Sequence, residues 1–103
     1  MESKENNLNK ADEEYRLYNT TKEAIHLQNA GESLFKAVKK HINEKYNENA
    51  KNYVDFFDIK MNEKDRKLFI FTNMSRLGVM TKKDDEAVFI AEQMYLDLRK
   101  RMN

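Results

Sequence analysis

The sequence predicts an α+β fold with helices in its N-terminal half, a central β-hairpin and a long C-terminal helix. Three observations support this prediction: helical spacing of apolar residues in residues 11–47, alternation in residues 54–72, and a return to helical spacing in residues 81–103. The 103 residues have the length of one domain. We therefore expect a flexible, polar N-terminal tail at residues 1–10 and a single domain at residues 11–103.

Residues 11–47 predict two or three helices. Their first apolar stripe consists of Ala11, Tyr15, Tyr18 and Ile25. The segment Thr20–Glu23 has the pattern of a capping box, so either a second helix begins there or the first runs through it. Gly31 and Ser33 then predict a stop and a new N-cap, for a helix that ends at about Asn47. The apolar face of that helix consists of Leu34, Phe35, Val38, Ile42 and Tyr46.

Residues 54–72 predict a β-hairpin. The segments Val54–Met61 and Lys67–Thr72 are rich in strand-forming residues, and the polar Asn62–Arg66 between them is typical of a turn. Because alternating apolar side chains need a covered face, we expect the hairpin to pack against the last helix. Its buried face should consist of Phe57, Ile59, Leu68 and Ile70. A loop at residues 74–80 then leads to that helix.

The C-terminal segment predicts one long helix. Thr81–Asp84 has a second capping-box pattern, with acidic residues at the start of the helix and basic residues at its end, as the helix dipole favours. A heptad-like seam along it consists of Val88, Ala91, Tyr95, Leu98 and Met102. Four further apolar residues lie outside the seam: Phe89, Ile90, Met94 and Leu96. A helix so nearly apolar around its circumference must be covered on two sides.

The second apolar side of this helix is covered either by the rest of the domain or by a partner. We expect a partner, because an exposed strip of this size exceeds the apolar patch that a monomer usually tolerates. A second copy of the chain is the simplest partner, since most small oligomers are symmetric dimers. The five seam residues are therefore the candidate homodimer interface, with Leu98 at its centre.

Composition limits where the chain works. Nineteen basic residues nearly balance eighteen acidic residues, so no global basic field indicates a nucleic-acid partner. There is no cysteine, no apolar run near the roughly 18 residues that span a bilayer, and no signal-peptide pattern at the start. We expect a cytoplasmic protein without a membrane partner. Abundant Lys, Asn, Ile and Phe are typical of the AT-rich genomes of low-GC bacteria and of their phages and plasmids.

No catalytic motif stands out. His26 and His41 are the two histidines, and neither has metal-ligand spacing or a serine motif beside it. Asp58–Lys60 and Asp65–Lys67 have the acid-x-Lys pattern of metal-dependent nucleases, but a chain this rich in charge contains such triplets by chance. We therefore expect no enzymatic activity, no cofactor, no metal and no small-molecule substrate.

The helix that ends near Asn47 has a polar face rich in lysine and asparagine. The candidate nucleic-acid contacts on it are Lys36, Lys39, Lys40, Asn43 and Asn47. Lysine binds phosphates and asparagine can pair with adenine, so this face fits a major groove. Helices followed by a hairpin with a charged tip also have the element order of a winged helix. The solvated face of an ordinary amphipathic helix explains the same residues.

Two functional hypotheses follow. The leading one is a small non-catalytic regulatory or adaptor protein that acts by protein–protein contact as a homodimer. A phage- or plasmid-encoded inhibitor of a host protein fits its size, charge and lack of catalytic motifs. The alternative is a winged-helix-like DNA-binding transcriptional regulator, which salt-dependent binding to DNA distinguishes from the first.

Overall fold

The computed structural model describes residues 3–80 and 85–103, with backbone alone for residues 77–80. In these ranges the regular secondary structure is entirely helical, with no β-strand. The helices are α1 (Lys4–Thr21), α2 (Ala24–Tyr46), α3 (Tyr53–Asp58), α4 (Glu63–Met80) and α5 (Asp85–Lys100). The α+β fold class predicted from the sequence is therefore wrong, and the fold is all-α.

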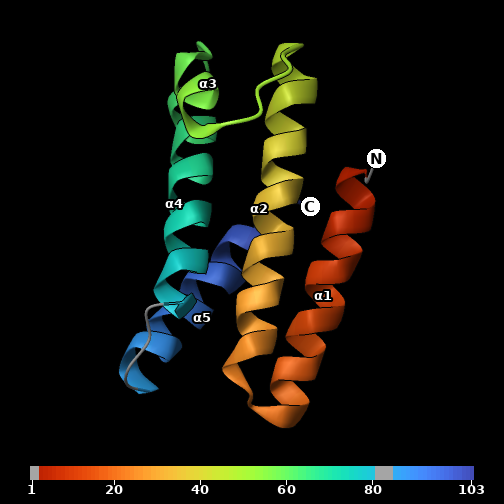
Figure 1. Ribbon diagram of the computed structural model, residues 1–103, viewed down its shortest axis with the longest axis vertical. Helices are drawn as coiled ribbons and strands as arrows, with labels where there is room; N and C mark the ends of the chain where they lie inside the picture. Colours follow the sequence, from red (N-terminus) through yellow and green to blue (C-terminus); the bar gives the residue numbers. More distant parts are fainter. Residues whose placement is uncertain (1–2, 81–84) are drawn as a thin grey trace.

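The helix α2 lies at the centre of the molecule. In Figure 1, α1 and α4 run along opposite sides of α2, and α5 crosses behind it. The short α3 lies beside the start of α4, at the end of the molecule where α2 finishes. No helix in the described ranges combines the length and the apolar character that crossing a bilayer requires.

The central position of α2 explains its burial. Its buried residues are Leu27, Ala30, Gly31, Leu34, Phe35, Ala37, Val38 and Ile42. The apolar face predicted from the sequence is thus confirmed, although Tyr46 at its end is only partly buried. Burial of each large apolar side chain in such a core contributes about 1.5–3 kcal/mol, so α2 supplies much of the stability that holds its neighbours.

The helix α1 begins at Lys4, inside the segment that the sequence predicted to be a flexible tail. The Ser3 hydroxyl caps it by accepting a hydrogen bond from the backbone N–H of Asn6 at 3.1 Å. Leu8 is buried in the core together with Ala11. One apolar side chain within a polar segment is therefore enough to extend the packed helix towards the N-terminus.

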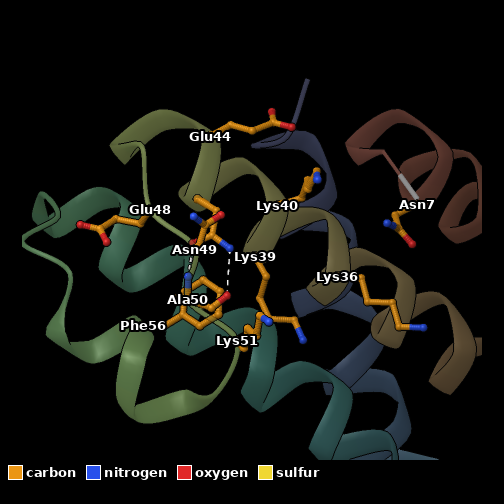
Figure 2. Close-up of a pocket in the computed structure, with 11 residues that line it drawn as sticks. Asn7, Lys36, Lys39, Lys40, Glu44, Glu48, Asn49, Ala50, Lys51 and Phe56 are labelled. Atoms are coloured by element: carbon orange, nitrogen blue, oxygen red, sulfur yellow. Dashed lines mark hydrogen bonds between the residues drawn. The ribbon is translucent and has the colours of Figure 1, made fainter. Parts of the chain in front are cut away.

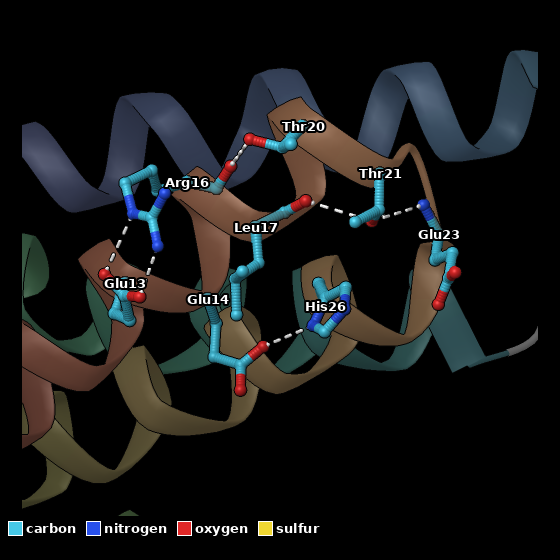
Figure 3. Close-up of polar contacts among 8 residues, drawn as sticks. All are labelled: Glu13, Glu14, Arg16, Leu17, Thr20, Thr21, Glu23 and His26. Atoms are coloured by element: carbon cyan, nitrogen blue, oxygen red, sulfur yellow. Dashed lines mark hydrogen bonds and ion pairs between the residues drawn. The ribbon is translucent and has the colours of Figure 1, made fainter.

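The break between α1 and α2 falls where the sequence offered a second helix start. Lys22 adopts a left-handed φ of 60°, and its backbone N–H donates to a carbonyl of the last α1 turn at 2.7 Å. The Thr21 hydroxyl accepts a hydrogen bond from the Glu23 backbone N–H at 3.1 Å (Figure 3). Across the two helices, His26 Nδ1 lies 2.7 Å from Glu14 Oε2. The helix C-cap therefore forms this turn, and Glu23 supplies no side-chain cap.

The helix α2 runs without interruption through Gly31 and Ser33, so the stop predicted there is wrong. Gly31 is buried against α4. A Cβ atom added to it would lie 3.2 Å from the Cβ and 3.3 Å from the Cα of Arg76. This glycine is therefore a packing residue, whose missing side chain lets α2 and α4 approach closely.

Residues 54–72, predicted to form a hairpin, belong to α3 and α4. Each of these helices follows an asparagine that caps it. Asn52 Oδ1 accepts a hydrogen bond from the Asp55 backbone N–H at 2.9 Å, and Asn62 Oδ1 accepts one from Asp65 at 2.8 Å. The polar segment expected to be a hairpin turn is instead the N-terminus of α4.

The strand prediction fails because a short apolar run fits either period. The buried face of α4 mixes polar and apolar residues: Asp65, Leu68, Phe69, Thr72, Asn73 and Ser75. These recur every three or four residues, which is helical spacing. Of the predicted hairpin face, Ile59 and Leu68 are buried, whereas Phe57 is 43% exposed and Ile70 is only partly buried. The predicted loop at residues 74–80 is also part of α4.

The helix α5 turns its seam into the core of its own chain. The buried seam residues are Ala91, Tyr95, Leu98 and Met102, with Val88 partly buried. Tyr95 stacks on Tyr15 of α1 with 5.4 Å between ring centroids. Arg99 donates two hydrogen bonds to the Asp12 carboxylate of α1, at 2.7 and 2.9 Å. The predicted helix start at Thr81–Asp84 lies outside the described residues.

Replacing Gly31 with leucine should separate α2 from α4. Leucine favours a helix, so any loss of stability would come from its side chain meeting Arg76. We expect Gly31→Leu to lower the free energy of unfolding by about 2 kcal/mol. Urea unfolding followed by circular dichroism measures this change. Glu44→Leu, at an exposed position of the same helix, should change it by less than about 0.5 kcal/mol. Equal stability of both variants would contradict the close contact.

Candidate functional site

A groove lined by lysines opens between α2 and the segment that follows it. Its lysines are Lys36, Lys39, Lys40 and Lys51. The other lining residues are Asn7, Asn43, Glu44, Glu48, Asn49, Ala50 and Phe56, and Figure 2 draws the lining residues as sticks. Its volume is about 740 Å³. We call this feature the lysine groove.

Hydrogen bonds of Asn43 hold the segment that follows α2 against the lysine groove. Asn47 ends α2 in a left-handed conformation, with φ of 54°. The chain then folds back, because Asn43 Nδ2 donates to the Ala50 carbonyl and Asn43 Oδ1 accepts from the Ala50 N–H, both at 3.0 Å (Figure 2). This paired hydrogen bond brings Lys51 to the same groove as the lysines of α2.

Lys39 is a partly buried lysine of this groove. Its Nζ lies 4.9 Å from the centroid of the Phe35 ring, and the Arg76 guanidinium carbon lies 4.8 Å from the same centroid. Burial lowers the pKa of Lys39, and the positive charge of Arg76 lowers it further. Arg76 is itself paired with Glu32 at 2.9 Å. The Phe35 ring thus contacts the Lys39 ammonium, and the negative charge of Glu32 also stabilises it.

Beside the lysine groove, the six-residue helix α3 presents apolar side chains to solvent. Tyr53 is 39% exposed, Val54 69% and Phe57 43%. Phe57 lies four residues after Tyr53 and three after Val54, so it neighbours both on the helix surface. We call these three residues the α3 apolar face.

The α3 apolar face is held in place by Phe69 of α4. Phe56 stacks on the Phe69 ring with centroids 4.9 Å apart, and Phe57 meets it edge-on at 5.8 Å. Tyr53 and Phe35 each lie 5.3 Å from the same ring. Aromatic pairs of this kind contribute about 0.5–1.5 kcal/mol each beyond their burial. A helix too short to be stable alone is therefore fixed by the core.

A polar lock joins the end of α2 to the start of α4, and so fixes both ends of the segment that carries α3. The Tyr46 hydroxyl donates to Asp65 at 2.5 Å and accepts from the Asn62 backbone N–H at 3.0 Å. Lys45 Nζ lies 2.9 Å from the same Asp65 carboxylate. Burial alone would raise the pKa of Asp65, but the Lys45 and Tyr46 donors outweigh burial and lower the pKa below its usual 3.8.

The residues predicted to contact nucleic acid are only partly brought together. Three of them, Lys36, Lys39 and Lys40, line the lysine groove with Asn43. Asn43 uses both ends of its amide on the Ala50 backbone, so its donor and acceptor are already engaged. Asn47 does not line the groove. The winged-helix element order is wrong, because helices replace the hairpin in the described residues.

The histidines and Asp65, which the sequence analysis considered for catalysis, take part in contacts within the fold. His26 faces Glu14, and His41 is partly buried on α2, where burial and then the charge of Lys4 lower its pKa. Asp65, from the acid-x-Lys triplet Asp65–Lys67, belongs to the polar lock. Among the described residues, no cluster of three or more His, Cys, Asp or Glu side chains could hold a metal ion. The seam predicted for a homodimer is covered within one chain.

Sequence reasoning missed Lys51 and the three residues of the α3 apolar face. The available signal was the capping pattern of Asn52 with Asp55 three residues later, which predicts a helix start at Tyr53. On a helix, two apolar residues that are four positions apart lie on the same side. The strand prediction instead placed the apolar residues of this segment on a covered face.

Comparison with known proteins gives no relative: no protein-family model, no curated protein and no solved structure matches this chain.

The polar lock at Asp65 predicts that the stability of the protein depends on pH. Because its folded-state pKa is lowered, the stability that Asp65 supplies is present above its unfolded-state pKa and is lost as pH falls through the folded value. At neutral pH, Asp65→Asn should lower the free energy of unfolding by about 2 kcal/mol. Below about pH 4 its difference from wild type should shrink.

Urea unfolding at several pH values measures both effects. Asp97→Asn is a suitable control, because its exposed carboxylate pairs with Arg101 only at the surface. The account fails if the Asp65→Asn and wild-type stabilities differ by the same amount at every pH.

Proposed function

We propose that this chain acts by binding another protein, through one surface formed by the α3 apolar face and the lysine groove. The observation that carries the proposal is the exposure of the α3 apolar face, on a helix that packs against the core through Phe56. Binding energy at interfaces comes chiefly from a few apolar or aromatic side chains with fixed positions and a polar surround. The regulatory or adaptor role expected from the sequence, including inhibition of a host protein, is a role of this kind.

A second exposed apolar pair supports an interface less well. Phe89 is 60% and Ile90 54% exposed on the outward side of α5. Consecutive residues of a helix diverge by about 100°, and the exposed Glu86 and Gln93 lie on the same outward side. The α3 apolar face joins three apolar residues to a charged groove, so we place the interface there. The proposal needs no homodimer, since the α5 seam is already covered.

Adding charge to the α3 apolar face should abolish partner capture without unfolding the chain. The tagged wild-type chain and the double variant Val54→Asp with Phe57→Asp would be incubated with an extract of the cells that encode it, and the captured proteins compared by mass spectrometry. The loss of two central contacts should weaken the binding of a specific partner by at least about 30-fold. Circular dichroism checks that both chains are equally helical.

The matched control is Ile25→Asp, which adds a charge at an apolar residue that is 50% exposed at the opposite end of α2. This variant should capture the same partner as wild type. If the double variant retains the captured proteins and Ile25→Asp loses them, the interface lies elsewhere and the proposal is wrong.

A further inference from the structure

We infer that the occupant of this surface is an acidic linear segment of the partner, with carboxylates in the lysine groove and an apolar side chain on the α3 apolar face. This inference rests on the proposed function and names the chemistry of the partner. It depends on the charges that line the groove, on the apolar residues next to it, and on the arrangement of the two in one surface.

Four lysines and two glutamates line the lysine groove, so its charge is positive. Within the described ranges, no carboxylate lies at ion-pair distance from the ammonium groups of Lys36, Lys39 or Lys51. Arg76 and Lys36 act on Lys39 as like charges, and Glu32 acts on it as an opposite charge. A carboxylate placed beside Lys39 would relieve this repulsion and replace the water that its partial burial removes.

The apolar face lies close to this charge. The Phe35 ring, which contacts the Lys39 ammonium, has its centroid 6.4 Å from that of Tyr53 in the α3 apolar face. Phe56 of the same helix forms part of the groove lining. Lys51 precedes α3 by two residues. A bound segment that places carboxylates on Lys39 and Lys51 therefore has an apolar surface next to it. Charged and apolar contacts at such short range favour one continuous segment.

The same features favour a peptide over a nucleic acid. Glu44 and Glu48 also line the lysine groove, and a nucleic-acid backbone with a phosphate at every step would meet their like charge. A peptide can place acidic residues opposite the lysines and neutral residues opposite the two glutamates.

Selection of peptides on the immobilised full chain tests the inference without knowledge of the partner. A displayed library of random linear peptides would be enriched on the wild-type protein, and the selected peptides synthesised with a fluorescent label. We expect sequences that combine aspartate or glutamate with an apolar residue, and affinity that falls as salt is added. Enrichment of basic or uncharged sequences, or no enrichment, would overturn the inference.

Variants separate the parts of the surface. The triple variant Lys36→Gln, Lys39→Gln and Lys51→Gln should bind the selected peptides about tenfold more weakly at low salt. The variant Glu44→Gln with Glu48→Gln has the opposite change of charge and should bind them more tightly. Unchanged affinity of the triple variant would overturn the inference, and tighter binding of a labelled oligothymidylate than of the selected peptides would do so in favour of nucleic acid.

The same peptides tell failure of the inference from failure of the proposed function. If Val54→Asp with Phe57→Asp loses binding and the triple lysine variant does not, the α3 apolar face binds a partner but the acidic segment is wrong. If neither set of changes affects binding, the surface is not the interface, and the proposed function is wrong as well.

Discussion

The buried ring of Phe69 is the contact on which this surface depends. It joins three helices, since Phe35 of α2 and three aromatic residues of α3 all pack on it. A six-residue helix has too few internal hydrogen bonds to persist alone. Without Phe69, Phe56 would lose its cover, and the α3 apolar face would have no fixed position. The core thus determines the shape of a surface that lies outside it.

Phe69 can occupy this position because α4 lies close to α2. Gly31 and Phe35 are one turn apart on α2, and they face Arg76 and Phe69, which are two turns apart on α4. The close approach at Gly31 therefore also places the Arg76 guanidinium over the Phe35 ring. Lys39 shares that ring, so the packing that anchors α3 also concentrates positive charge at the groove. Apolar packing and electrostatics at the site have one structural origin.

Much of the central helix could be predicted from the sequence, because its apolar residues follow a strict helical period. Leu34, Val38 and Ile42 are buried as that pattern indicates, and the helix ends at the predicted Asn47. The lysines of its other face were also identified. Their meeting with Lys51 was not, since it depends on the Asn43–Ala50 hydrogen bonds formed after the chain reverses.

Two features were hidden from sequence reasoning for different physical reasons. The buried face of α4 contains Thr72 and Asn73, and these polar residues interrupt the apolar period by which a helix is recognised. On α5, the apolar seam correctly indicated burial, but a pattern does not say which surface provides the cover. The chain's own helices provide it: α4 packs against α5, and Tyr15 of α1 stacks on Tyr95.

The central claim is that the α3 apolar face and the lysine groove act as a single binding surface. Nuclear magnetic resonance of the isotope-labelled chain, titrated with an acidic peptide that contains one apolar residue, tests it most directly. The account predicts that chemical-shift changes appear together in Tyr53–Asp58, in Lys51 and in the Lys36–Lys40 turn of α2, with one common affinity. Changes centred on Phe89 and Ile90 of α5, or different affinities for α3 and the groove, would contradict it.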